Sequence, residues 1–281
     1  MARWRKLGVI AGGGALPAKV GEACAAAGKD CFFIRLAGVA GEELSPYPGE
    51  DCAIGEAGKI IRLLKQMECD AVVYAGFVRR PDFSGLKVDW RGAALLPKIM
   101  KAAARGDGAI LSVLVETLEA EGFIVIGADE VVNDAACEAG PIGRLRPDDR
   151  QMSDIRKAAA IVQALGPFDV GQGAVVANGF VLAIEAAEGT DAMLDRCAEL
   201  AMGGERNGVL VKRPKPGQEL RVDLPVIGAE TVRRAAAAGL AGVAVEAGHA
   251  IIMDREETAA LADETGLFVY GFSAQELAAK T

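Results

Sequence analysis

The feature that most constrains the fold is an apolar strand that runs directly into three glycines and a helix. Residues 7–11 read LGVIA, Gly12, Gly13 and Gly14 follow, and a helical pattern covers residues 15–27. Strand, glycine turn and helix N-terminus together form an anion site, because free backbone N–H groups and the helix dipole face the turn. We therefore predict a nucleotide or phosphate at the three glycines. A glycine turn that serves only packing is the alternative.

Two residues disfavour NAD as that ligand. The dinucleotide-binding fingerprint has a third glycine where this chain has Pro17. The next strand, residues 31–36, ends near Arg35, where an NAD site prefers an acidic residue for the ribose. The fold is interpreted as Rossmann-like, and an NAD-dependent oxidoreductase is kept only as an alternative.

Strands and helices continue to alternate through the first half of the chain, which predicts a parallel sheet with right-handed crossovers. Arg79 and Arg80 follow one of these strands, at the carboxyl end where open α/β sheets bind ligands. They are candidate phosphate ligands, with a solvated surface turn as the alternative. Asp107 is expected to be the N-cap of a helix, with a ligand role as the alternative. The expected helices cover residues 57–67, 92–104 and 108–121, and the expected strands cover 70–75 and 123–127.

The composition changes at residues 139–151, which are rich in proline, glycine and charge. We place a linker there, between a Rossmann-like domain at 1–138 and a second domain at 152–281. The second domain is predicted to begin with a helix capped by Ser153. Its strand signals include antiparallel elements, so we expect a mixed α+β domain rather than a copy of the first.

The second domain contains a β-hairpin signal, Asn178-Gly179, that leads to a group of polar residues. Acids and a threonine gather where the next helix begins. They are candidate sugar or metal contacts, but Thr190 as a cap and acids near a helix N-terminus would also be ordinary helix chemistry. The residues are Glu185, Glu188, Gly189, Thr190 and Asp191.

The loop at residues 212–231, KRPKPGQELRVDLPVIGAET, is the strongest functional candidate. Its prolines oppose regular structure, and so long a connection is usually functional or disordered. Apolar residues before and within it indicate anchoring to a core. Cations beside lone carboxylates suit a phosphate and a hard metal ion. The charged residues up to position 223 are Lys212, Arg213, Lys215, Glu219, Arg221 and Asp223.

The charge and the residue inventory exclude several function classes. A formal net charge of −8 opposes nucleic acid as the main partner. His249 is the only histidine, and its apolar neighbours indicate a structural role, which excludes His-rich metal sites and disfavours a Ser-His-Asp triad. No P-loop motif is present. Carboxylates, lysines, arginines and backbone amides remain, and they are adequate for phosphoryl chemistry with magnesium.

Four long runs resemble one family, the magnesium-dependent UDP-2,3-diacylglucosamine diphosphatases of the two-domain, histidine-independent type. They are LGVIAGGGALP (7–17), AGFVRRPDF (75–83), DVGQGAVVANGFVLAIEAAEGTDAML (169–194) and KRPKPGQELRVDLPVIGAET (212–231). The resemblance implies water attack on the α-phosphorus, which gives 2,3-diacylglucosamine 1-phosphate and UMP in lipid A synthesis. It also implies Mg²⁺ as cofactor, a substrate between the two domains, and an essential aspartate in an R-x-D-x-P segment, here Asp223.

The resemblance and the residue patterns together give the expected site. Asp223 is assigned as the magnesium ligand or as the base that orients the attacking water, and Glu185 as a second candidate metal ligand. The remaining residues are assigned to substrate binding. They are Gly12, Gly13, Gly14, Arg79, Arg80, Gln172, Glu188, Gly189, Thr190, Asp191, Lys212, Lys215, Arg221 and Thr231.

The rival hypothesis is a non-catalytic sensor of nucleotide-activated sugars or lipids that uses the same cleft. The six scattered cysteines read as reduced thiols, and no signal peptide or membrane span is evident. We expect a cytoplasmic protein. Because no amphipathic polybasic helix is evident, only weak peripheral contact with the inner face of the inner membrane is expected. The expected partners are the lipid substrate and product, and a homodimer is considered.

Overall fold

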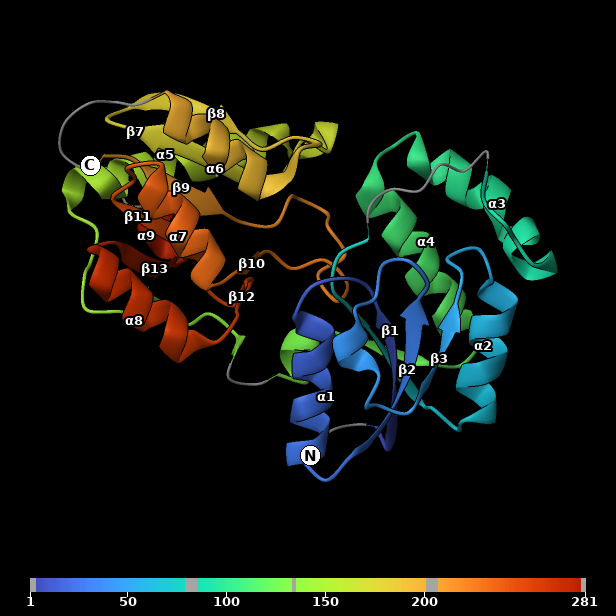
Figure 1. Ribbon diagram of the computed structural model, residues 1–281. Coiled ribbons are helices and arrows are strands. Elements are labelled where there is room, and N and C mark those ends of the chain that lie inside the picture. The colour runs from blue at the N-terminus through green and yellow to red at the C-terminus, as the bar shows by residue number, and fades with distance from the viewer. Residues whose placement is uncertain (1–3, 79–84, 133–134, 201–206, 279–281) are drawn as a thin grey trace. The chain divides into compact units, whose positions relative to one another are not determined.

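The chain forms two α/β units in the computed structural model, which describes residues 4–78, 85–132, 135–200 and 207–278. The N-terminal unit comprises Met1–Asn133 together with Glu219–Asp223 (Figure 1). The C-terminal unit comprises Asp134–Gln218 and Leu224–Thr281. Five residues of the charged loop therefore belong to the N-terminal unit, although the chain on both sides of them belongs to the C-terminal unit.

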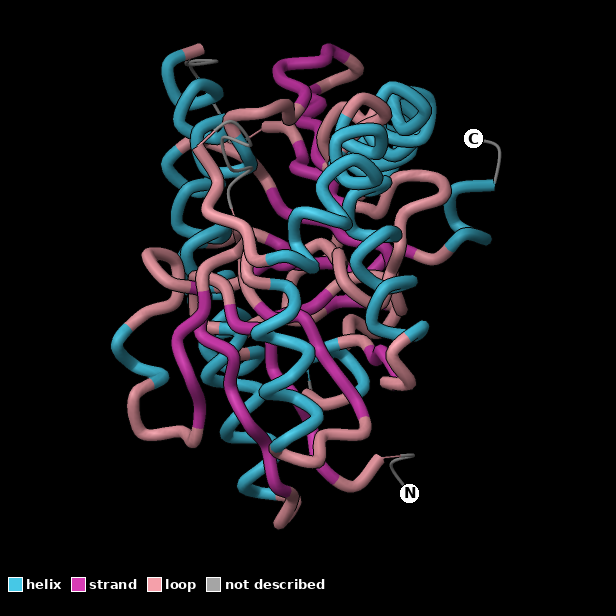
Figure 2. Tube along the Cα trace, turned by 90° about the vertical axis from the view of Figure 1, so that its right-hand side faces the viewer, coloured by secondary structure: helices cyan, strands magenta, loops and turns pink. Residues whose placement is uncertain are grey.

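A five-stranded parallel sheet forms the centre of the N-terminal unit, in the order β3-β2-β1-β4-β5. Chain order reverses between β1 and β4, so their carboxyl ends form the switch point at which open α/β sheets bind ligands. Strands and helices alternate along much of this unit, except that α4 follows α3 directly. Figure 2 shows the strands in magenta and the helices in cyan. The elements are β1 (Lys6–Ala11), α1 (Leu16–Ala26), β2 (Asp30–Leu36), β3 (Gly49–Cys52), α2 (Ala57–Gln66), β4 (Ala71–Ala75), α3 (Trp90–Ala103), α4 (Asp107–Ala120) and β5 (Ile124–Ile126).

Helices cover both faces of this sheet. Ile34 and Val72 belong to the same buried cluster as Leu64 of α2 and Leu118 of α4, while α1 packs on β1, β2 and β4. The predicted Rossmann-like parallel domain is confirmed. Strand β3 was not predicted from the sequence, because GEDC is a short, charged edge strand without apolar alternation.

The C-terminal unit contains a six-stranded mixed sheet in the order β6-β13-β11-β9-β7-β8. Its central strands β9, β11 and β13 are parallel, and the outer pairings are antiparallel, which confirms the predicted mixed domain. A separate parallel pair joins β10 to β12. The elements are β6 (Gly140–Pro141), α5 (Asp149–Leu165), β7 (Gly173–Ala177), β8 (Phe180–Ile184), α6 (Gly189–Glu199), β9 (Val209–Lys212), β10 (Val226–Ile227), α7 (Ala229–Ala237), β11 (Gly242–Glu246), β12 (Ile251–Ile252), α8 (Arg255–Thr265), β13 (Phe268–Phe272) and α9 (Ala274–Ala278).

Helices also cover both faces of the mixed sheet. Met193 of α6, Val232 of α7 and Ala262 of α8 belong to a cluster on one face, and Ile155 of α5 belongs to a cluster on the other. None of the helices in the described ranges is both long and apolar enough to span a bilayer.

Two predicted helix caps are wrong. Helix α5 begins before Ser153, because Asp148 and Gln151 form a capping box in which Asp148 Oδ1 accepts from the Gln151 amide at 2.8 Å. Residues 139–151, predicted as a linker, include the short strand β6 and the first residues of α5, with irregular chain between them. Helix α4 has Gly106 as its N-cap, and Asp107 lies in its first turn instead.

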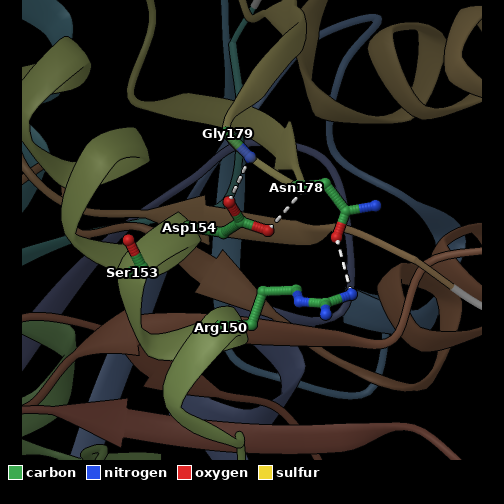
Figure 3. Close-up of a pocket in the computed structure, with 5 residues that line it drawn as sticks. All are labelled: Arg150, Ser153, Asp154, Asn178 and Gly179. Carbon is green, nitrogen blue, oxygen red and sulfur yellow. Dashed lines mark hydrogen bonds between the residues drawn. The ribbon is translucent and has the colours of Figure 1, made fainter.

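The predicted hairpin is confirmed, and a buried carboxylate holds its turn. Asn178 and Gly179 both have positive φ, 50° and 78°, as a two-residue type I′ turn requires. Asp154 of α5, 3% exposed, accepts from the Asn178 amide at 2.8 Å and from the Gly179 amide at 2.7 Å (Figure 3). A shallow depression beside the turn is lined by these residues, Arg150 and Ser153.

Replacing Asp154 is expected to destabilise the protein. Asp154→Ala leaves two backbone donors without their acceptor, so we expect the free energy of unfolding to fall by about 2–4 kcal/mol. The exposed neighbour Ser153→Ala is the matched control and should change it by less than about 0.5 kcal/mol. Urea unfolding followed by circular dichroism measures both, and equal stability of the two variants would contradict this account of the turn.

Candidate active site

The glycine turn after β1 is already engaged with the loop after β4. The amide of Gly12 donates to the Ala75 carbonyl at 2.8 Å, and the amide of Gly13 donates to the Phe77 carbonyl at 2.9 Å. Phe77 returns a bond from its own amide to the Gly13 carbonyl at 3.0 Å. Because both amides are used inside the N-terminal unit, neither is available to a phosphate in this arrangement.

Close packing explains why the first two positions are glycine. A Cβ on Gly12 would lie 2.5 Å from the Phe77 carbonyl oxygen, and a Cβ on Gly13 would lie 2.9 Å from the Phe77 ring. Gly14 is exposed and has φ +87°, which disfavours other residues. The anion prediction therefore rests on Gly14 and the first turn of α1. Arg79 and Arg80, also predicted at this edge, lie outside the described residues.

The segment Glu219–Asp223 is fastened to the N-terminal unit by Arg221. Glu219 accepts from Arg221 Nε at 2.9 Å and from its NH2 group at 2.8 Å, and Glu119 of α4 accepts from its NH1 group at 2.6 Å. The hydrogen bonds to Arg221 lower the pKa of Glu219, and those to the two carboxylates raise the pKa of Arg221. The guanidinium predicted to bind phosphate is thus held by two carboxylates.

Asp223 follows this anchor at the carboxyl edge of the same sheet. Val222 packs against the cluster beneath α2 and α4, and a Cβ on Gly127, after β5, would lie 3.8 Å from the Arg221 Cα. The Asp223 amide donates to the Glu219 carbonyl at 3.2 Å, and Asp223 is half-buried. The N-terminal unit therefore carries the predicted catalytic aspartate at the strand edge that also carries the glycine turn.

The C-terminal unit gathers a second group of predicted residues along one edge of its sheet. The Glu185 amide donates to the Gly173 carbonyl at 2.9 Å, and Gly173 pairs with Lys212 across β7 and β9. Lys212 pairs in turn with Val245 of β11. Glu185, Gln172 and Lys212 are thus neighbours at adjacent strand ends, although they are far apart in the sequence.

Glu185 is a buried, hydrogen-bonded carboxylate. It is 6% exposed, and it accepts from the Thr190 hydroxyl at 2.8 Å and from the backbone N–H of Gln172 at 3.2 Å. Gly171 has φ +48°, and a Cβ there would lie 2.0 Å from the Glu185 carbonyl oxygen. Thr190 lies in the first turn of α6, and its hydroxyl donates to Glu185, so it does not take the alternative role of helix cap.

The two lysines of the loop have different surroundings. Lys212 is 6% exposed, and its ammonium donates to the Val226 carbonyl at 3.2 Å. Lys215 forms an ion pair with Asp169. Beside them, the side-chain oxygen of Gln172 is buried and has no hydrogen-bond partner within the described part of the chain. A buried acceptor of this kind suits a donor from a bound ligand.

The other predicted substrate contacts of the C-terminal unit lie at the starts of helices and are not part of the group at the strand ends. Glu188 forms an ion pair with Arg196 at 2.6 Å, and its own amide and Arg196 lower its pKa. Asp191 is exposed and lies 3.8 Å from Arg234. Gly189 begins α6 with φ +81°. Thr231 lies half-buried in the first turn of α7.

Sequence reasoning did not assign three charged residues that the structure brings to these groups. Glu119 holds Arg221, Asp169 holds Lys215, and Glu246 at the end of β11 holds Arg213 at 3.0 Å. Glu246 could have been found, because it lies at the carboxyl end of β11, which pairs in parallel with β9, the strand that ends at Lys212. Glu119 gave no signal, since it reads as an ordinary exposed helix residue.

The predicted metal ligands do not form a ready-made protein cage. The described ranges contain no group of three or more His, Cys, Asp or Glu side chains placed to hold a metal ion. Asp223 belongs to the N-terminal unit and Glu185 to the C-terminal unit. Magnesium commonly takes one or two protein carboxylates and completes its shell with phosphate and water, so Asp223 with a bound diphosphate fits the chemistry of this ion.

Comparison with known proteins places the chain in a family. The family model described as the LpxI N-terminal domain matches residues 6–135, and the model described as the LpxI C-terminal domain matches residues 138–270. The chain belongs to the LpxI family. A relative from Caulobacter vibrioides, named UDP-2,3-diacylglucosamine pyrophosphatase LpxI, is 50% identical over 277 residues, which cover 97% of this chain and 99% of the relative. The family resemblance inferred from the sequence runs is confirmed, and its two LpxI domains agree with the two α/β units.

The Arg221 anchor predicts a pH-dependent contribution to stability. Because the folded state lowers the pKa of Glu219, its contribution is present above the unfolded pKa of about 4.3 and is lost as pH falls through the folded value. Glu219→Gln should therefore lower the free energy of unfolding by about 1 kcal/mol near neutral pH.

The difference between parent and Glu219→Gln should shrink as the pH is lowered from about 7 to about 3. Urea unfolding at several pH values measures it, with the exposed α4 residue Glu116→Gln as control. A difference that stays constant down to the lowest pH would show that the Glu219 carboxylate does not stabilise the segment through its charge.

Proposed function

We propose that this chain hydrolyses UDP-2,3-diacylglucosamine, giving 2,3-diacylglucosamine 1-phosphate and UMP in lipid A biosynthesis. One observation carries the proposal, namely 50% identity over nearly the full length of both chains to the Caulobacter relative named for this substrate. The two edges described above supply groups of the kind this reaction needs, which are cations, backbone amides and an aspartate on an anchored segment.

The reaction is a hydrolysis at the α-phosphorus. The water oxygen forms a bond to that phosphorus, the bond to the bridging oxygen breaks, and the sugar 1-phosphate leaves with its electron pair. Negative charge grows on the phosphate oxygens in the transition state, and cations placed beside them lower its free energy. In this proposal Lys212 contributes most, because its ammonium is buried and an interaction with a buried cation is weakly screened.

Asp223 has the central role in the proposal. Its carboxylate follows the Arg221 anchor, so its backbone is fixed before substrate binds. A fixed carboxylate can accept a proton from the attacking water or hold it in line with the phosphorus. Both the magnesium-ligand role and the general-base role remain part of the proposal.

Mg²⁺ is proposed as the cofactor, with Asp223 and substrate phosphate oxygens as its ligands. When bound, it would supply positive charge that stabilises the oxygens of the diphosphate. Glu185 suits a supporting role better, because both of its carboxylate oxygens already accept hydrogen bonds within the C-terminal unit. The expectation that the active site lies between the two domains stays a prediction, as do the homodimer and the weak membrane contact.

Asp223→Asn should retain substrate binding and lose turnover. The amide keeps the size of the side chain but removes the charge and the basicity, so we expect kcat to fall by about 10²–10⁴-fold or more with little change in affinity. Product formation is measured by mass spectrometry, with the exposed carboxylate variant Asp149→Asn as control. Substantial remaining activity in Asp223→Asn would sink the assignment.

A comparison of metal dependence decides the role of Glu185. If Glu185 only holds Thr190 and Gln172, Glu185→Gln should lower stability and kcat while the magnesium concentration for half-maximal activity stays the same. A tenfold or larger rise in that concentration, a scale typical of lost metal contacts, would instead make Glu185 a metal ligand. Tight binding of intact substrate without products, with and without chelator, would favour the sensor hypothesis for the whole chain.

A further inference from the structure

Helix α3 presents an apolar strip to solvent in the N-terminal unit. An α-helix has 3.6 residues per turn, so residues spaced by three or four positions lie on the same side. Trp90, Ala93, Pro97, Met100 and Ala104, the last at the helix end, have this spacing, and all five are exposed. Trp90 is 78% exposed and Met100 is 56% exposed. Tryptophan and methionine at such exposure are unusual on a water-facing helix, where large apolar side chains normally face the core.

The opposite side of α3 is committed to the fold. Gly92 and Ala102 are buried, and Leu95, Leu96 and Ile99 are less exposed than the strip. The helix packs on α2 and α4 of the same unit (Figure 1). Pro97 leaves the Ala93 carbonyl without its usual helical donor, and both residues are exposed, so water or a polar headgroup can supply a replacement donor.

A row of cations borders the apolar strip. Lys98, Lys101 and Arg105 follow one flank of it, and no ion pair between described residues engages any of the three. Residues 87–105 hold five basic side chains and one acidic side chain, in a chain whose net charge is −8. The single acid, Asp89, is occupied as the N-cap, where it accepts from the Gly92 amide at 2.7 Å. The positive charge is therefore local and is not a property of the whole surface.

We infer that this surface of α3 docks on an anionic phospholipid bilayer. An exposed tryptophan with small apolar neighbours and a basic flank is the arrangement by which helices lie in the membrane interface. Each cation near an anionic membrane strengthens binding about fivefold. The inference deepens the proposed function, because a diacylated substrate resides in a membrane. The sequence pattern did not indicate it, since the exposed strip is mostly alanine and proline.

Vesicle binding by the purified full-length chain tests this docking surface without substrate. The chain has two tryptophans, and Trp4 is 8% exposed, so Trp90 reports on the surface. Vesicles of phosphatidylcholine with about one-third phosphatidylglycerol should shift the emission to the blue and protect it from aqueous quencher, and phosphatidylcholine alone should do much less. The blue shift should be absent in Trp90→Phe, which keeps Trp4 as its single tryptophan.

A matched pair of triple variants separates local from total charge. Lys98→Gln, Lys101→Gln and Arg105→Gln together should weaken vesicle binding by roughly 100-fold in co-sedimentation. Arg62→Gln, Arg146→Gln and Arg233→Gln remove the same charge from other exposed positions and should change it little. Equal binding by the two triples, or no binding by the parent, would overturn the inference.

Self-association is the competing use of the strip. A concentration-dependent dimer that Trp90→Ala disrupts, in a parent that ignores anionic vesicles, would assign the surface to a second copy and overturn the inference. Because the vesicles contain no substrate, docking can fail while hydrolysis of detergent-dispersed substrate succeeds. The reverse outcome, vesicle binding without hydrolysis, would leave the docking surface standing and remove the proposed function.

Discussion

The ion-pair cluster around Arg221 is the interaction on which the candidate site depends. A guanidinium offers a planar set of donors that one carboxylate can fill bidentately while a second binds the remaining edge, and Glu219 and Glu119 do this here. Without that cluster, a proline-rich loop would have little to fix its path past β5. With it, Asp223 is held at a defined position of the N-terminal unit.

Both units use the same general property of α/β sheets. Backbone groups and side chains at the carboxyl ends of parallel strands converge on one edge, so residues from separate parts of the chain become neighbours. In the N-terminal unit that edge holds the glycine turn and Asp223. In the C-terminal unit it holds Glu185 and Lys212, and Gln172 joins them from the start of the antiparallel strand β7. A chain with one histidine can thus assemble acidic and cationic groups without a histidine-based centre.

Much of the fold could be predicted from the sequence, because long apolar runs and turn residues act locally. The first strand, the glycine turn and the Asn178-Gly179 hairpin are such cases. The site was harder to predict, since its main contacts join residues that no local pattern relates. Glu119 and Arg221 are separated by 102 positions, and the engagement of the Gly12 amide depends on a strand that lies far along the chain.

The membership of Glu219–Asp223 in the N-terminal unit has a consequence for biosynthesis. The ribosome releases the strands of the first sheet long before it releases Arg221. The ion pair between Glu119 and Arg221 therefore cannot form until most of the second sheet has been translated. The order of synthesis and the order of completion therefore differ. A gene cut after the first sheet would encode a unit that lacks its own final segment. If the two halves were expressed separately, the second half would have to supply residues 219–223 to the first.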